Sequence, residues 1–217
     1  MSEEMFRQLA QVVLDGEPEQ AERLAAGALE NALDPLDCIN KGLNVGIAEV
    51  GDLYAAGDYF LPDLIAGSEA MKAALNVLEP ALTGSNRKRE ILGRVVLGTV
   101  KGDLHDIGKT LVGAMLSANG FQITDIGVDK AADEFLAAAK ETKATLVGAS
   151  ATLTTTILEQ GKVILAFKEA GLRDKVKMII GGAPVTRDWA EEINADGFAE
   201  DAVAAVALAK RLVAVQV

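Results

Sequence analysis

The 217-residue sequence predicts an α/β protein in two parts, an N-terminal four-helix bundle followed by a flavodoxin-like (Rossmann-type) five-stranded parallel sheet. Two observations predict this. Apolar residues recur with a helical period before a short polar stretch at residues 83–90, and β-rich apolar runs alternate with helical stretches after it. We therefore expect domains at residues 1–86 and 90–217. The 21 glycines and the low aromatic content of 4% suit closely packed helices and tight turns.

Prolines mark the helix starts in the first part. Pro18, Pro35 and Pro62 each stand where a helix is expected to begin, a position at which the missing proline N–H costs nothing. The helices are predicted over residues 2–15, 18–32, 35–56 and 61–81. A break or bend is expected in the third helix near Gly42 and Gly46, because glycine weakens a helix interior by about 1 kcal/mol.

Five strand–helix units are expected in the second part. The predicted strands are residues 94–100, 122–127, 145–149, 177–180 and 197–199, and the predicted helices are 106–119, 131–141, 153–171, 186–195 and 201–214. In the flavodoxin-like strand order 2-1-3-4-5, ligands bind beyond the carboxyl ends of strands 1 and 3. The loops after Val100 and Ala149 are therefore expected side by side, with any site between them.

The only histidine, His105, lies in the loop after the first predicted strand. Asp103, two residues earlier, is placed to accept a hydrogen bond from one ring nitrogen, which leaves the other nitrogen free as a ligand or base. Gly102 and Gly108 would let the backbone approach something bulky. The alternative is a surface histidine in a strand–helix turn, with Asp106 capping the next helix.

Hydroxyl side chains crowd the loop after the third predicted strand. They are Ser150, Thr152, Thr154, Thr155 and Thr156. Hydroxyls and small side chains suit a polar slot into the sheet, and Thr156 is a candidate to orient Asp103. The alternative is a set of N-caps for the following helix, a position that hydroxyl-bearing residues favour.

Glycines follow the fourth predicted strand. Gly181, Gly182 and Ala183 precede a proline, and they permit a sharp turn or leave room for a ligand ring against the backbone. Neither a GxGxxG nor a Walker motif is present, so a phosphate-cradling loop is not indicated.

Aromatic residues concentrate at one place in the first part, residues 59–61. The segment containing Phe60 is interpreted either as a staple in the bundle core or as an apolar lid over the site. Cys38 is expected to be a buried small hydrophobe, and Trp189 to pack between helix and sheet.

Charge and composition exclude several classes of function. The net charge of −11 argues against binding nucleic acid or an anionic membrane through bulk electrostatics. A single cysteine excludes an internal disulfide and a multi-cysteine metal site, which fits a reducing cytoplasm. The sequence contains no membrane-length apolar run, and its acidic start is unlike a signal peptide, so a cytoplasmic protein is expected.

Together these residues resemble a known family. Residues 103–108, Asp-Leu-His-Asp-Ile-Gly, match the D-x-H-x-x-G motif of base-off, His-on cobalamin-binding domains. Ser150 follows His105 by 45 residues, and Gly181-Gly182 come later, in the order of that family's S-x-L and GG elements. The third S-x-L position is Thr152 here, with Leu153 one place later. Residues 50–62 are similar to the helical cap of cobalamin-dependent methionine synthase and of the corrinoid proteins of methanol, methylamine and aryl-ether methyltransferase systems.

The resemblance implies a role for each matching residue. His105 would be the lower axial ligand to cobalt in place of the cofactor's dimethylbenzimidazole, and Asp103 and then Thr156 would form a hydrogen-bonded relay behind it. The displaced nucleotide tail would run between strands 1 and 3, and Phe60 would cover the upper, methyl-bearing face. The implied cofactor-binding set is Gly102, Asp103, Leu104, His105, Asp106, Ile107, Gly108, Ser150, Thr152, Leu153, Thr154, Thr156, Gly181, Gly182, Ala183 and Phe60.

The resemblance also implies a function. The protein would be a corrinoid methyl carrier whose cobalamin alternates between methylcobalamin and cob(I)alamin. It would be one subunit of a multi-component methyltransferase rather than a complete catalyst. Its partners would be a substrate-specific TIM-barrel methyltransferase, a second methyltransferase that delivers to tetrahydrofolate or a thiol, and a reductive activase. The sequence leaves the donor open among methanol, methylamines, betaines and methoxylated aromatics.

Two alternatives share the cobalamin-binding sheet domain. One is a cobalamin-sensing regulator, but residues 1–90 hold 7 Lys and Arg against 16 Asp and Glu, so such a regulator would have to act through a protein partner. The other is the small subunit of an adenosylcobalamin mutase, against which the methyl-transfer type of cap over residues 35–81 argues.

Overall fold

The structure, a computed structural model, describes residues 2–82 and 91–214. The chain divides into two compact units, Met1–Glu90 and Ile91–Val217. The polar stretch expected at residues 83–90 lies outside the described residues. No helix in the part of the chain that the structure describes is both long and apolar enough to cross a membrane.

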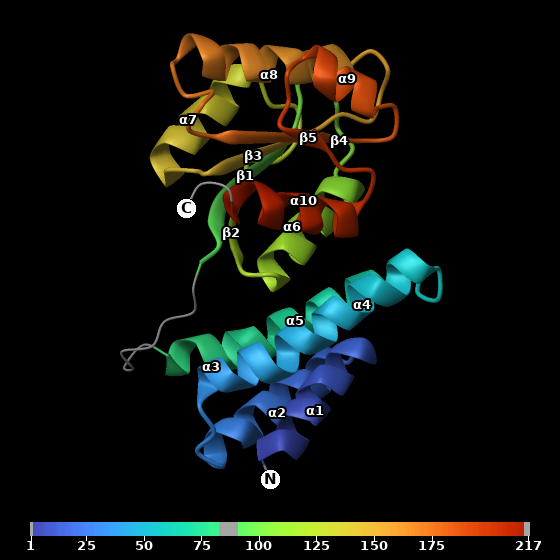
Figure 1. The fold of residues 1–217 in the computed structure, drawn as a ribbon, viewed down its shortest axis with the longest axis vertical. Coiled ribbons are helices and arrows are strands. Elements are labelled where there is room, and N and C mark those ends of the chain that lie inside the picture. Colours follow the sequence, from blue (N-terminus) through green and yellow to red (C-terminus); the bar gives the residue numbers. More distant parts are fainter. Residues whose placement is uncertain (1, 83–90, 215–217) are drawn as a thin grey trace. The chain divides into compact units, whose positions relative to one another are not determined.

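The first unit is helical (Figure 1). Its elements are α1 (Ser2–Leu14), α2 (Pro18–Glu30), α3 (Pro35–Cys38), the π-helical turn η1 (Ile39–Leu43), α4 (Asn44–Ala56) and α5 (Leu61–Ala81). Because α3, η1 and α4 follow one another without a break in the chain, they form the third of the four predicted helices. The interruption expected near Gly42 is the π-helical turn.

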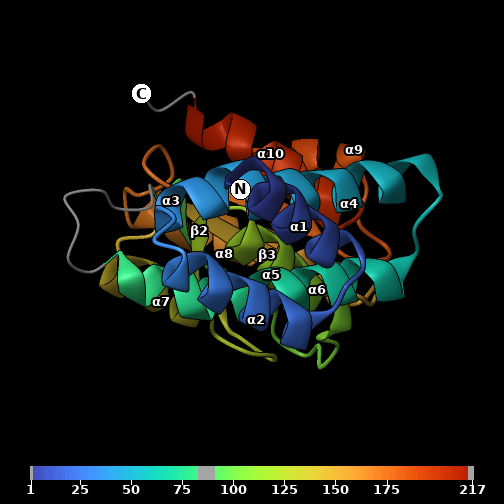
Figure 2. The same ribbon diagram turned by 90° about the horizontal axis from the view of Figure 1, so that it is seen from below.

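The helices of this unit pack through small and aliphatic side chains. Helix α1 contacts α2, α4 and α5, and α2 contacts α5, as can be followed in Figure 2. Leu9, Ile47 and Met71 are among the fully or almost fully buried residues. Cys38 is also completely buried, as expected of a small hydrophobe. Burial of each large aliphatic side chain contributes roughly 2 kcal/mol, so this apolar interior stabilises the bundle.

The second unit is a parallel sheet between two layers of helices (Figure 1). Its elements are β1 (Gly93–Thr99), α6 (Ile107–Ala118), β2 (Phe121–Asp125), α7 (Ala132–Thr142), β3 (Leu146–Ser150), α8 (Ile157–Glu169), β4 (Lys177–Gly181), α9 (Arg187–Glu192), β5 (Gly197–Phe198) and α10 (Ala202–Ala214). The strand order β2-β1-β3-β4-β5, all parallel, confirms the predicted flavodoxin-like sheet. Helices α7, α8 and α9 cover one face, and α6 and α10 cover the other.

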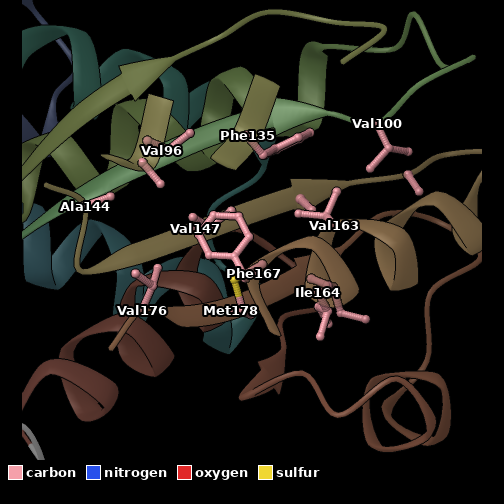
Figure 3. Packing of buried hydrophobic residues seen from close by; sticks show 14 of the residues in the cluster. Val96, Val100, Phe135, Ala144, Val147, Val163, Ile164, Phe167, Val176 and Met178 are labelled. Atoms are coloured by element: carbon pink, nitrogen blue, oxygen red, sulfur yellow. The ribbon is translucent and has the colours of Figure 1, made fainter. Parts of the chain in front are cut away.

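The core beneath α7 and α8 explains why the sheet is stable (Figure 3). Val96, Val147 and Met178 come from three neighbouring strands, and Phe135 and Phe167 reach them from the two helices; all five are completely buried. Successive residues of a strand point to opposite faces of the sheet. Because helices cover both faces here, the strands can carry apolar residues on both.

The strand register positions the loops. Thr99, the last residue of β1, lies beside Ser150, the last residue of β3. The loops that follow these strands therefore leave the same edge of the sheet next to each other, as predicted. Helix α8 begins at Ile157, four residues later than predicted, because residues 153–156 form hydrogen-bonded turns instead.

Candidate functional site

The loop after β1 begins with a tight turn. The Asp103 N–H donates to the Val100 carbonyl at 3.2 Å, and Gly102, the third residue of the turn, has a φ of 80°. That left-handed conformation is the one a type II turn requires at its third position, which glycine adopts without strain. The turn directs the chain back toward the loop after β3.

Asp103 is the centre of the polar contacts in the site. Its side chain is completely buried. One carboxylate oxygen, Oδ1, accepts from the His105 N–H at 3.1 Å and lies 2.7 Å from the ring Nδ1 of His105. The other, Oδ2, accepts from the Thr152 N–H at 2.6 Å and from the Thr156 hydroxyl at 2.9 Å. The site thus joins the loop after β1 to the loop after β3 through one carboxylate.

These donors determine the charge of Asp103. Burial by itself would raise the pKa of the Asp103 carboxyl, because it disfavours the charged form. The hydrogen bonds from the Thr152 N–H, from the ring and backbone of His105 and from Thr156 outweigh burial and lower the pKa to about 2. The carboxylate therefore stays ionised at neutral pH.

The ionised carboxylate sets the tautomer of His105. A carboxylate only accepts hydrogen bonds, so the proton of the neutral imidazole belongs on Nδ1 and the lone pair on Nε2. The His105 side chain is 57% exposed, in contrast to the completely buried Asp103. The distance between Nδ1 and Oδ1 confirms the predicted Asp103–His105 hydrogen bond. With its other ring nitrogen, the neutral imidazole can present one oriented donor to a metal.

Thr99 makes a hydrogen bond to the backbone of His105. This residue ends β1, is completely buried, and donates its hydroxyl to the His105 carbonyl at 2.9 Å. Thr99 was not among the site residues predicted from the sequence. Its signal was a lone hydroxyl directly after the apolar residues 95–98 of the strand, where a buried polar group must find a partner.

Side-chain capping was the alternative for Asp106 and for the hydroxyl residues of the loop after β3, and it is wrong for Asp106 and for Thr156. Asp106 and Thr156 occupy the N-cap positions of α6 and α8, but neither side chain makes a capping hydrogen bond. The Thr156 hydroxyl shares its single proton between Asp103 and the Leu153 carbonyl, and its oxygen accepts from the Leu153 N–H. Its role is to connect Asp103 to the loop after β3, as predicted.

Gly182 is the position at which the loop after β4 meets the loop after β3. Its φ is 128°, and a Cβ atom built there would lie 1.8 Å from the Ala151 carbonyl oxygen. Only glycine fits, because any side chain would enter the neighbouring backbone. The Ala151 N–H donates to the Gly181 carbonyl at 3.0 Å, which holds the two loops together.

A buried glutamine side chain connects the ends of β3 and β4. Gln160 of α8 donates to the Ala149 carbonyl at 2.9 Å and the Gly181 carbonyl at 3.1 Å. Its side-chain oxygen accepts from the indole N–H of Trp189 at 3.1 Å. Trp189 is partly buried against the core between the helices and the sheet, as expected, and its hydrogen bond to Gln160 was not predicted.

Other predicted residues surround this polar centre. Leu104 and Ile107 are 73% and 74% exposed, which is unusual for large apolar side chains, and Leu153 is also exposed. Thr154 and Ala183 are exposed on the neighbouring loops. A Cβ atom at Gly108, in the first turn of α6, would meet no atom within 4 Å. Ser150 accepts at its carbonyl from the Val100 N–H at 3.0 Å.

Phe60 belongs to the other unit, the helical one. It precedes α5, where its N–H donates to the Asp63 carboxylate at 2.8 Å. Its side chain is 66% exposed, so the interpretation as a core staple is wrong.

The chain matches known proteins along nearly all of its length. Two family models, each described as a B12 binding domain, match residues 5–79 and 93–207. A corrinoid protein of Desulfitobacterium hafniense is 43% identical over 96% of this chain and 97% of its own. The trimethylamine corrinoid protein of Methanosarcina barkeri is 40% identical over 96% of each chain. A chain of the methanol:cobalamin methyltransferase complex of Methanosarcina barkeri superimposes with a TM-score of 0.86 and 31% identity, covering 97% of this chain and 80% of that one.

Proposed function

The chain belongs to the B12-binding corrinoid proteins, and we propose that it carries a methyl group between two methyltransferases. Its relatives are named for trimethylamine and dimethylamine, and a structural neighbour belongs to a methanol methyltransferase complex. Those names support methyl transfer over sensing or radical chemistry. They also favour a small methylated amine or alcohol as the methyl donor.

The observation that carries the proposal is the Asp103–His105 hydrogen bond. It leaves Nε2 of the exposed imidazole as a neutral donor, which is what a cobalt ion requires of a histidine ligand. His105 would therefore hold the cofactor in the base-off, His-on form. When bound, cobalamin supplies a cobalt that can accept a methyl group from one partner and release it to the next.

The surrounding residues fit the rest of the cofactor. The exposed Leu104 and Ile107 offer an apolar surface for the corrin ring beside His105. The displaced nucleotide tail would run between strands β1 and β3, past Ser150, Thr154 and the Gly181–Gly182 turn. The close backbone approach at Gly182 gives that slot a wall without side chains. The remaining contacts would come from Asp103, Asp106, Gly108, Thr152, Leu153, Thr156, Ala183 and Gly102.

Phe60 would shield the reactive face of the cofactor. An exposed aromatic side chain in an aromatic-poor chain is suited to cover an apolar ligand.

The proposed partners are a TIM-barrel methyltransferase that loads the carrier, a second enzyme that unloads it onto tetrahydrofolate or a thiol, and a reductive activase.

Electron paramagnetic resonance tests the ligand. Because His105 is the only histidine, labelling the protein with 15N-histidine marks a single residue. In the reconstituted protein with reduced, paramagnetic cobalt, coordination by labelled His105 splits each cobalt line into a doublet, whereas dimethylbenzimidazole gives a triplet. Unlabelled protein is the control and should return a triplet. A triplet in labelled protein, or an unchanged spectrum in His105→Ala, would overturn the assignment.

Isotope transfer tests the carrier role. The reconstituted protein is first reduced to the cob(I)alamin form with a chemical reductant, and is then incubated with 13C-methanol or 13C-trimethylamine and the matching purified methyltransferase. We expect a labelled methyl group to remain with the protein after gel filtration and to be lost in His105→Gly. Absence of label with both donors would contradict the proposal for these substrates.

A further inference from the structure

The segment of residues 125–130, which begins with the last residue of β2 and leads toward α7, lies against the loop that carries His105. Asp129 makes two contacts there. Its carboxylate accepts from the Gly102 N–H at 2.7 Å, and its own N–H donates to the Asp103 carbonyl at 3.0 Å. Both ends of the Gly102–Asp103 dipeptide are therefore bonded to a single residue from another loop.

These two contacts fix the orientation of Asp103. The turn that ends at Asp103 is closed by only one hydrogen bond of its own, from the Asp103 N–H to the Val100 carbonyl at 3.2 Å. The bonds from Asp129 hold the last two residues of that turn from outside. A rotation of the turn would swing the Asp103 carboxylate away from Thr152, Thr156 and the imidazole.

Asp129 adopts a backbone conformation that the surrounding bonds maintain. Its φ is 55°, in the left-handed region that aspartate tolerates better than most residues but that still costs of order 1 kcal/mol. The Lys130 N–H donates to the Thr99 carbonyl at 2.9 Å, and the Gly127 carbonyl accepts from the Thr99 N–H at 3.0 Å. The loop is thus tied to the end of β1 on both sides of Asp129.

A second contact holds the far end of the His105 loop. Lys109, in the first turn of α6, is buried and forms an ion pair with Asp125 at the end of β2. The other carboxylate oxygen of Asp125 accepts from the Gly127 N–H at 2.8 Å. A buried ammonium group is costly unless it is paired, so this contact fixes where α6 begins relative to residues 125–130.

We infer that residues 125–130 are a brace that positions the cobalt ligand, with Asp129 as its main positioning residue. The brace holds the His105 loop before the histidine, through Gly102 and Asp103, and after it, through Lys109. The inference rests on the proposed role of His105 as a ligand. Loss of residues that orient a metal-binding histidine typically weakens the metal bond about tenfold or more, which sets the expected effect.

Three substitutions of Asp129 distinguish the contribution of its carboxylate from that of its backbone conformation. Asp129→Asn keeps both an acceptor oxygen and tolerance of a positive φ. Asp129→Gly keeps the backbone conformation but removes the acceptor, and Asp129→Ala removes both. Asp133→Ala, an exposed aspartate in the first turn of α7, is the matched control for loss of charge.

The first readout needs no cofactor. In the 15N-histidine-labelled full chain, nuclear magnetic resonance reports the tautomer of the single imidazole. The wild type, Asp129→Asn and Asp133→Ala are expected to show one tautomer, with the proton on Nδ1. Asp129→Ala and Asp129→Gly are expected to show averaging between tautomers. An unchanged tautomer in folded Asp129→Gly would overturn the role of the carboxylate, even if Asp129→Ala failed to fold.

The second readout is the 15N doublet in the reconstituted protein. We expect the ratio of histidine-bound to histidine-free cobalt to fall about tenfold in Asp129→Ala and Asp129→Gly and to be restored in Asp129→Asn. A doublet of wild-type intensity in Asp129→Gly would overturn the brace while leaving His105 as the ligand. A wild-type protein without the doublet would overturn the ligand assignment, and the tautomer measurement would still decide the brace.

Discussion

The loops around Asp103 in the α/β unit and the turn before α5 in the helical unit are built in opposite ways. In the first region, the buried Asp103 carboxylate receives four hydrogen bonds from two loops. Two of them come from backbone N–H groups and two from side chains. Before α5, an exposed Phe60 side chain extends from a turn held by backbone bonds and by Asp63.

The difference follows from what each region is proposed to do. A metal ligand must be held in one direction, and a satisfied polar network in a buried site provides that rigidity. An apolar cover needs only exposed surface, which leaves it free to move or change. Substitutions around Asp103 should therefore cost stability and geometry, whereas substitutions at Phe60 should cost function alone.

Gly182→Ala should have the largest effect on stability. Its Cβ would lie 1.8 Å from the Ala151 carbonyl oxygen at a φ of 128°, so the loops must separate, at an expected cost of about 3 kcal/mol or more. Urea unfolding followed by Trp189 fluorescence measures it, since the only tryptophan lies in this unit. Gly108→Ala, in a helix with open space around the Cβ, is the control and should be neutral or stabilising by about 0.5–1 kcal/mol. Equal stability of the two variants would contradict the close approach at Gly182.

Asp103→Asn should have an intermediate effect that depends on pH. Hydrogen bonding lowers the pKa of Asp103 from its ordinary value of 3.8 to about 2 in the folded state. A depressed pKa stabilises the fold above about pH 4, and that contribution, roughly 2 kcal/mol, is lost as the pH falls through about 2. The difference in unfolding free energy between wild type and Asp103→Asn should therefore shrink as the pH falls from 4 to 2. A constant difference would show that the carboxylate charge does not stabilise the site.

Phe60→Ala should have the smallest effect on stability. Because the side chain is 66% exposed, the unfolding free energy of the helical unit should change by less than about 0.5 kcal/mol. Tyrosine fluorescence measures it, since both tyrosines lie in this unit. Phe6→Ala, at a buried position in α1, is the control and should cost about 3–5 kcal/mol. We expect bound, reduced cofactor to be oxidised faster in Phe60→Ala than in the wild type. A large loss of unfolding free energy in Phe60→Ala would contradict the contrast between the two regions.

Much of this organisation could be predicted from local patterns. Alternating apolar runs and helical periods predicted the parallel sheet and its order, and therefore the edge at which the loops after β1 and β3 meet. The spacing of Asp103 and His105 predicted their hydrogen bond, because an aspartate side chain readily bonds to the residue two places later. Thr156 was the correct choice for the next hydroxyl.

Features that neighbours along the chain do not determine could not be predicted. Asp106 stands at a helix start, where capping is the local choice, but its side chain makes no capping hydrogen bond. Asp129 carried no signal in its own neighbourhood, since its partners lie in a different loop. The exposure of Phe60 was likewise a matter of packing that its aromatic neighbours in the sequence could not reveal.

The sequence by itself determined the two-part organisation, the sheet and the pairing of Asp103 with His105, because helical period, strand alternation and a two-residue spacing are properties of neighbours along the chain. Only the tertiary structure decided which groups hold that pair in place. Thr152, whose N–H donates to Asp103, lies 49 residues from it, and Asp129 lies 27 residues from Gly102. Bonds over such separations depend on the path of each loop at the sheet edge, and packing of the whole sheet against its helices determines those paths.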